Sequence, residues 1–337
     1  MKREDLVATV AGFAGAAAVF AVMFWLVDAR AVLDAVRRAD PGLILVAAGT
    51  ILLWNVSWGC ALYNVLGALD IDVPVHTALL VNAAGAFANH VTPFGQAGGE
   101  PVTAWLLSRT TETEYEVSLA SITSLDAINV VPSLLFATGG SLYYVAATGT
   151  GSELGVLPLA VVGGAAVVAV AVAVGWRYRD GARARVNRTL VPLVERASGL
   201  LPGRAPIDPD ALAGRVAEFT GALGRVAVSR NRLAAAIGCS ALGWAFQAVG
   251  LWVVFLALDA PIPVYVPFFV LPLGKVGSAL PTPGGLGGTE AVNVTLLALL
   301  TGAGAAPIAA AVTIHSVGGY LLTTSIGAAA TSALGVR

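Results

Sequence analysis

Long apolar runs separated by short polar segments divide the chain into six candidate membrane spans. An α-helix needs about 20 mainly apolar residues to cross the hydrocarbon core of a bilayer. Runs of this length lie at 6–27, 42–67, 117–146, 155–175, 232–258 and 305–330. The pattern predicts an all-α polytopic membrane protein that forms a single integral membrane domain over residues 1–337.

Two further apolar regions, 75–110 and 262–302, are each interrupted by a turn rich in glycine and proline. The pieces of the first region are short for two crossings, whereas those of the second are nearer to spanning length. Each region is therefore expected to be either a re-entrant helix pair or two tilted crossings, and the second alternative gives a total of about eight transmembrane helices. Both alternatives return the chain to the side from which it came.

The two interrupted regions carry matching motifs. Residues 92–100 read T-P-F-G-Q-A-G-G-E, and residues 282–290 read T-P-G-G-L-G-G-T-E. Their Thr, Pro and Glu positions coincide at an offset of 190 residues, and Trp54 matches Trp244 at the same offset. A duplicated, glycine-broken membrane segment that carries an acid is typical of a transporter site.

This duplication predicts two repeats of inverted topology, with repeat 1 at 1–146 and repeat 2 at 155–330. Each repeat has two full spans before its interrupted region and one full span after it. Three net crossings make an odd number, so the second repeat is expected to be inverted relative to the first. The two interrupted regions then approach from opposite faces of the membrane and meet near its midplane.

The distribution of arginine sets the expected orientation. Of the 17 arginines in the chain, 11 lie between Arg177 and Arg232. Because positively charged loops stay on the cytoplasmic side, the loop 176–231 is placed there, and both chain termini follow it. The polar segment 28–41 then lies outside, and the plasma membrane is the expected location. Within the Arg-rich loop, residues 210–228 have the spacing of an amphipathic helix; a helix along the inner leaflet and an ordinary solvated loop are equally open alternatives.

Composition points to the same class of protein. The chain is 57% hydrophobic and 12% charged, whereas soluble domains contain about 25% charged residues. The two cysteines have no partners at metal-ligand spacing, so no metal and no cofactor are expected. No nucleophile elbow, phosphate-binding loop or nucleic-acid module is recognisable, which argues against an enzyme and against a nucleic-acid partner.

The glycines of the two motifs mark the expected substrate site. Irregular backbone at membrane depth is tolerated only where it is buried in protein or lines a polar cavity. The helices that begin after the breaks present free N–H groups, which favour an anion such as a lipid phosphate. The alternative is that the glycines only allow spans to pack closely. The residues expected to line the site are Gly98, Gly99, Gly287, Gly288 and Asn89.

Charged side chains in the same regions give the sharpest candidates. Lys275 is the only lysine beyond position 2, and a cation at mid-span costs about 3 kcal/mol unless it is paired or reaches the interface. We expect it to clamp a phosphate or carboxylate; the alternative is a salt bridge to Asp126, Glu100 or Glu290. The two glutamates stand in the first turns of their helices, where they either cap the helix or act in proton transfer and recognition of a cationic headgroup.

A proton relay is a further hypothesis. Asp126 lies inside the predicted span 117–146, and at the offset of 190 it falls on Ser316, beside His315. His90 adds a second histidine on the first interrupted region. Histidine titrates near neutral pH and therefore suits a relay. The alternative is that these side chains are hydrogen-bonded packing residues.

The two motifs together resemble those of the lysylphosphatidylglycerol synthase transmembrane family. The resemblance rests on T-P-x-G-x-x-G-G-E-P at 92–101 and P-x-P-G-G-x-G-x-x-E at 281–290. That family includes the flippase half of bacterial multiple-peptide-resistance factors and stand-alone YbhN-like membrane proteins. The resemblance implies lipid translocation between leaflets, with Glu100 and Glu290 as the motif acids. The chain stops at Arg337, right after the last predicted span, so no lysyl-transferase activity is expected.

The sequence thus favours a flippase-like transporter of a phospholipid or a polyprenyl-phosphate-linked lipid, with the membrane lipid as its partner. One alternative is an ion-coupled secondary transporter of a small solute. Another is a non-catalytic membrane partner of a glycosyltransferase or lipid-modifying enzyme. The oligomeric state is left open by the sequence.

Overall fold

The computed structural model describes residues 29–92, 96–148, 209–279 and 285–335, together with Ala17, Ala21 and Thr282. Every element within these ranges is a helix. The predicted spans 6–27 and 155–175 lie outside the described residues, as do most of the Arg-rich loop and the turns at 93–95 and 283–284 of the two motifs.

Four long apolar helices form the frame of the described part of the molecule. Each has the length and hydropathy needed to cross a membrane, and 39–50% of its most apolar stretch is buried inside the protein, which leaves the rest to face lipid. They confirm four predicted spans to within a few residues at each end. These helices are α3 (Pro41–Ala68), α6 (Tyr115–Thr148), α10 (Arg230–Ala257) and α13 (Ala305–Ala333).

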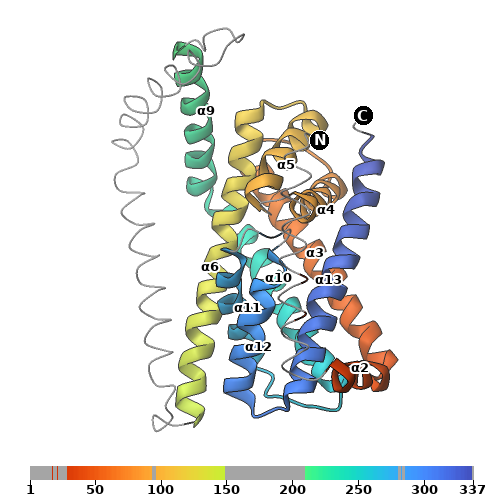
Figure 1. The fold of residues 1–337 in the computed structure, drawn as a ribbon. Helices are drawn as coiled ribbons and strands as arrows, with labels where there is room; N and C mark the ends of the chain where they lie inside the picture. Colours follow the sequence, from red (N-terminus) through yellow and green to blue (C-terminus); the bar gives the residue numbers. More distant parts are fainter. Residues whose placement is uncertain are drawn as a thin grey trace.

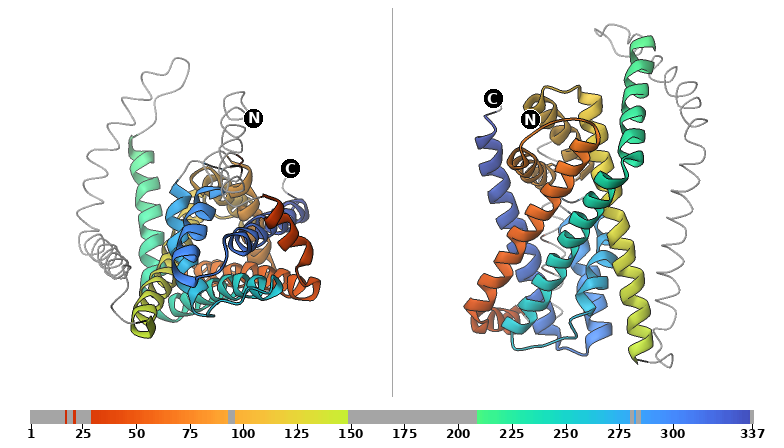
Figure 2. Two further views of the ribbon diagram at one scale, coloured as in Figure 1. Left: turned by 60° about the horizontal axis from the view of Figure 1, so that its bottom comes forward. Right: turned by 180° about the vertical axis from the view of Figure 1, so that it is seen from behind.

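Helices α3 and α10 pack side by side in opposite directions (Figures 1 and 2). The Asp40 backbone N–H, just before α3, donates to the Ala257 carbonyl at the end of α10 over 2.8 Å. Near the middle of both helices, the Trp58 indole lies against Gly243, where a Cβ atom would clash with it. Small residues let helix backbones approach closely inside a membrane, and this crossing forms one face of the bundle (Figure 2).

The interrupted regions form two helix pairs at opposite ends of the bundle (Figure 1). The prediction that each region consists of two helical pieces around a break is confirmed. Helix α4 is 17 residues long, or about 25 Å at 1.5 Å per residue, which is short of a bilayer core. One pair is α4 (Val75–Val91) with α5 (Gln96–Thr111); the other is α11 (Val266–Gly274), continued by the 3-10 helix η2 (Lys275–Ala279), with α12 (Gly288–Thr301).

The two halves of the chain share unusual backbone conformations at matching positions. Asp70 and Asp259 follow α3 and α10, have φ of 58° and 50°, and are 189 residues apart. Glu112 and Gly302 precede α6 and α13, have φ of 54° and 63°, and are 190 residues apart. Left-handed residues are common at helix ends, and the matching spacing of these pairs agrees with the predicted repeats.

The pair Glu112 and Gly302 provides a test of this backbone duplication. A Cβ added at Gly302 would meet no atom within 4 Å, so Gly302→Ala acts only through its φ of 63°. We expect this change to lower the free energy of unfolding by about 1 kcal/mol, and Glu112→Gly to leave it unchanged or raise it by up to about 1 kcal/mol. Thermal unfolding in detergent measures both. Equal effects of Gly302→Ala and of Gly139→Ala, at an open helical site, would contradict the assignment.

Two further described helices lie in the polar segments 28–41 and 176–231, and the second agrees with the helical alternative for residues 210–228. Residues within the expected outside segment 28–41 form α2 (Ala29–Arg38), which packs against α13. Helix α9 (Pro209–Val228) stands upright beside α6 (Figures 1 and 2). Its Phe219 and Leu223 pack on a cluster of residues from α3, α6, α9 and α10, so this side of α9 is covered in part by protein.

Candidate functional site

Lys275 lies at the inner end of one helix pair, within electrostatic range of the inner end of the other. This residue is the first of η2, where the α-helix tightens into a 3-10 turn. Its ammonium group interacts electrostatically with His90, in the last turn of α4, and with Glu290, in the first turn of α12. The Lys275 side chain is exposed. Lys275 is therefore a cation at the end of one helix pair that acts electrostatically on a residue at the end of the other.

Glu290 holds the start of α12. Its side chain is only 3% exposed, and Oε2 accepts a hydrogen bond of 2.5 Å from the Gly287 backbone N–H. The φ of 91° at Gly287 lies in the region that favours glycine. A carboxylate at this position satisfies a free helix N–H and complements the positive end of the helix dipole. Glu290 also acts electrostatically on Lys275.

The second motif glutamate has a different partner. The Glu100 side chain, in the first turn of α5, forms a hydrogen bond with the Asp126 side chain in α6. Two carboxyl groups this close to each other share a site, and each influences the ionisation of the other. The structure thus joins an acid from the first motif to the acid that the sequence placed inside the following span.

His90 is held by α13. Its ring stacks on Tyr320 with centroids 4.1 Å apart, and its Nδ1 lies 2.7 Å from Thr324 Oγ1. The Tyr320 hydroxyl also donates to the His90 carbonyl over 2.8 Å. Tyr320 and Thr324 were not among the site residues predicted from the sequence, although their spacing of four places them on one face of a helix.

Asparagine and glycine interlock within each helix pair. A Cβ at Gly99 would collide with Asn89, and a Cβ at Gly274 would collide with Asn293. Both asparagine Oδ1 atoms are buried and have no hydrogen-bond partner within the described residues. Asn293 is 2% exposed. It was not among the site residues predicted from the sequence, although it lies one turn after Glu290. The predicted site residues Gly99 and Asn89 are therefore in direct contact.

The other predicted glycines lie close to these contacts. A Cβ at Gly98 would press on Thr92 at 2.9 Å, and Gly277 approaches the Gly288 carbonyl so closely that a Cβ would collide with it. All of these glycines bring the two helices of a pair together at their inner ends.

His315 lies in different surroundings. It is buried in α13, its Nε2 is 3.1 Å from the Gln247 carbonyl of α10, and its ring is 5.6 Å from that of Trp54. Within the described residues, the three members of the predicted relay thus have three separate sets of partners: Glu100 for Asp126, Tyr320 with Thr324 for His90, and Gln247 for His315.

The matching tryptophans stabilise the helix crossing. Trp54 and Trp58 have ring centroids 6.4 Å apart, and Trp58 is 6.4 Å from Trp244 in an edge-on arrangement. The Trp244 Nε1 donates to the Asn129 carbonyl of α6 over 3.1 Å. Trp54 and Trp244 are both buried. They are packing residues and, with Trp58, connect α3, α6 and α10.

The fold and the site together define a multi-pass α-helical membrane protein whose glycine-rich helix pairs converge on charged residues. Among the described residues, no group of three or more His, Cys, Asp or Glu side chains is arranged to hold a metal ion.

The chain belongs to the family described as the lysylphosphatidylglycerol synthase TM region, which it matches over residues 9–327. Two proteins of Methanothermobacter thermautotrophicus, each described as a UPF0104 membrane protein, are similar along nearly their whole length. One is 26% identical over 336 residues, which are 96% of this chain and 93% of the relative. The other is 23% identical over 341 residues, which are 98% of this chain and 95% of the relative. The resemblance inferred from the two motifs is confirmed.

Proposed function

We propose that this protein translocates a membrane lipid between leaflets, without a chemical step on the lipid. Membership of the lysylphosphatidylglycerol synthase TM family supports a role with membrane lipids. The proposed substrate is a phospholipid or a polyprenyl-phosphate-linked lipid, because both carry a phosphate in the headgroup.

The observation that carries the proposal is the position of Lys275. It is an exposed cation at a break in a membrane helix, and it acts electrostatically on a residue at the end of the opposite helix pair. An ammonium group is a strong ligand for phosphate as a point charge. The start of α12 adds backbone N–H groups at the same place, and its capping carboxylate limits the net positive charge there. The anionic headgroup is proposed to bind at Lys275 and the helix starts, between the two pairs.

The proposed motion follows from an inverted repeat. Helices α3 and α10 have the same length of 28 residues and run in opposite directions, and the same holds for the directions of α6 and α13 (Figure 1). The helix pairs, as re-entrant hairpins, would alternately open the Lys275 site to either face while the repeats rock about the α3–α10 crossing. We place the protein in the plasma membrane with both termini cytoplasmic, on the basis of its arginine distribution.

Lipid movement by purified protein in liposomes tests the proposal. Dye-labelled anionic, zwitterionic and polyprenyl-phosphate lipids are placed in both leaflets, and dithionite reduces the dye on the outer side only. Translocation leads to bleaching beyond the outer-leaflet fraction for the transported class, with and without a pH gradient. Bleaching equal to that of protein-free liposomes for all three classes, from folded protein, would contradict the proposed function.

The Glu100–Asp126 contact predicts that transport responds to a proton gradient. Glu100→Gln and Asp126→Asn retain hydrogen-bonding groups but remove the exchangeable carboxyl proton. We expect each to abolish the acceleration of lipid movement by a pH gradient while transport without a gradient falls by less than about threefold. The liposome assay at symmetric and asymmetric pH measures both rates.

The control for this prediction is Glu112→Gln, which changes an exposed carboxylate at the α5–α6 corner. It should respond to the gradient as the unmodified protein does. If Glu100→Gln and Asp126→Asn also keep the full response, or if the unmodified protein shows none, the carboxyl pair is not the coupling site.

A further inference from the structure

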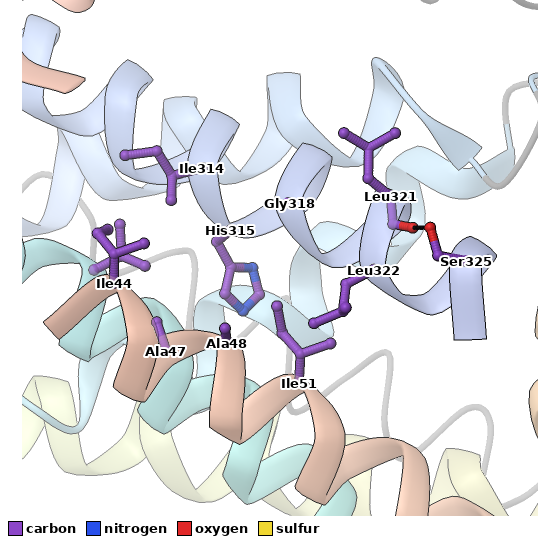
Figure 3. A pocket seen from close by; sticks show the side chains of 11 residues that line it. Ile44, Ala47, Ala48, Ile51, Ile314, His315, Gly318, Leu321, Leu322 and Ser325 are labelled. Atoms are coloured by element: carbon purple, nitrogen blue, oxygen red, sulfur yellow. Dashed lines mark hydrogen bonds between the residues drawn. The ribbon is translucent and has the colours of Figure 1, made fainter. Parts of the chain in front are cut away.

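A cavity of about 410 Å³ lies between α3, α10 and α13, apart from the Lys275 site (Figure 3). Natural small-ligand sites have volumes of about 300–1,000 Å³. The lining is almost entirely aliphatic and includes Ile44, Ile51, Val254, Ile314 and Leu322.

The cavity has almost no free hydrogen-bonding groups for an occupant to satisfy. Among the described residues, His315 and Ser325 are the polar side chains that line it. Their nearest partners are in the protein, because His315 Nε2 lies 3.1 Å from the Gln247 carbonyl and the Ser325 hydroxyl donates to the Leu321 carbonyl over 2.8 Å. Apolar cavities without free polar groups stay dry and accept hydrocarbon ligands.

The cavity opens toward the exposed surfaces of α3 and α13. Leu321, which lines the cavity, is 60% exposed. On the adjoining face of α3, Leu45 is 73% exposed and Leu52 is 48% exposed. Both α3 and α13 have the composition of membrane spans, so exposed leucines at this depth adjoin lipid chains and not water.

Helix α13 separates this cavity from the polar site. Its residues Ile314, Gly318 and Leu322 face the cavity, whereas Tyr320 and Thr324 hold His90 on the side of the site. Helix α13 therefore lines the apolar groove with one face and holds a polar contact, to His90, with another. A lipid with its headgroup at Lys275 and one chain in this groove would span α13.

We propose that the cavity between α3, α10 and α13 binds one hydrocarbon chain of a membrane lipid. The inference deepens the proposed function, because it supplies the chain subsite for the lipid whose headgroup is bound at Lys275. The occupant is an acyl or isoprenoid chain; an apolar segment of this chain or of another protein is the alternative that the experiment separates.

The experiment blocks the cavity from within. Gly318 lines it, and a Cβ added there would meet no atom within 4 Å, so Gly318→Leu fills space without displacing backbone. Gly139→Leu is the matched control, because it is a helical glycine with equally open surroundings on α6. The full-length protein is reconstituted with a phosphatidylglycerol that carries a photoactivatable diazirine in one acyl chain. After illumination, lipid adducts are mapped by peptide mass spectrometry.

We expect adducts on α3 and α13 at the cavity lining to exceed, by about fivefold per residue, those at the exposed Leu142 and Tyr143 of α6, which sample bulk lipid. Gly318→Leu should reduce the cavity adducts to the bulk level, and Gly139→Leu should leave them unchanged. Cavity adducts at or below the bulk level in the unmodified protein would overturn the inference and indicate a protein segment as the occupant. Adducts that persist in Gly318→Leu would also overturn it.

This readout is independent of transport. Enriched adducts without any lipid movement in the liposome assay would contradict the proposed function but support the chain subsite. Lipid movement without enriched adducts would support the proposed function but contradict the chain subsite.

Discussion

Lys275→Ala is expected to reduce lipid movement in liposomes at least about tenfold, because it removes the exposed cation proposed to bind the headgroup. A hydrogen bond to a charged group contributes about 1.5–3 kcal/mol, which corresponds to about 10- to 150-fold in binding. Lys275→Arg keeps the charge and should retain part of the activity, since its planar guanidinium differs in shape from an ammonium group. Dithionite bleaching measures all three proteins, with elution as a single peak in size-exclusion chromatography as evidence of folding.

Two variants make this prediction specific. Glu290→Gln keeps an oxygen that can accept from the Gly287 N–H but removes the charge beside Lys275. We expect a loss of lipid movement comparable to that of Lys275→Ala, whereas a residue that only caps α12 would leave it unchanged. Arg37→Ala removes an exposed arginine whose partner is Asp34, 3.7 Å away, and should have no effect. Full activity in both Lys275→Ala and Glu290→Gln would overturn the site assignment.

Gly277→Ala is expected to destabilise the fold by about 3 kcal/mol, the upper part of the range for overpacked sites. A Cβ at this position would collide with the Gly288 carbonyl group and lie 2.6 Å from the Thr289 nitrogen. These are backbone atoms at the start of α12, so no side chain can rotate away and η2 must separate from α12. The melting temperature in detergent should fall by several degrees, and activity should fall with it.

The matched control is Gly139→Ala, where a Cβ would meet nothing within 4 Å. Because alanine favours a helix over glycine by up to about 1 kcal/mol, this change should leave stability unchanged or raise it. A Gly277→Ala protein as stable as the Gly139→Ala protein would show that the close approach of η2 and α12 does not hold the second helix pair.

Much of the architecture was predictable from the chain because membrane helices are governed by one-dimensional rules. Hydropathy and length decide where a helix can cross a bilayer, and the four described spans agree with the predicted ones to within a few residues. The breaks in the two interrupted regions were also predictable, since glycine and proline act on the local backbone. The two motifs predicted a repeat, and the positive φ of Asp70 and Asp259 agrees with that prediction.

The neighbours of the short polar helices could not be predicted from the sequence. The segment 28–41 has no long apolar run, yet part of it forms α2, which packs on α13. Helix α9 was predicted to be amphipathic, but whether lipid, water or protein covers its apolar side depends on what stands beside it. The neighbours of α9 come from α3, α6 and α10, which are distant in sequence.

The sequence by itself determined that this protein crosses a membrane, that it contains two related broken regions, and which side chains are too polar to face lipid without a reason. Only the tertiary structure decided the partners of those side chains. It brings Asp126 close to Glu100 and His90 onto Tyr320, places Lys275 within electrostatic range of Glu290, and holds His315 between α13 and the α3–α10 pair. The physical reason is that span formation depends on the solvent preference of each segment, whereas side-chain pairing depends on how rigid helices pack across long distances in the chain.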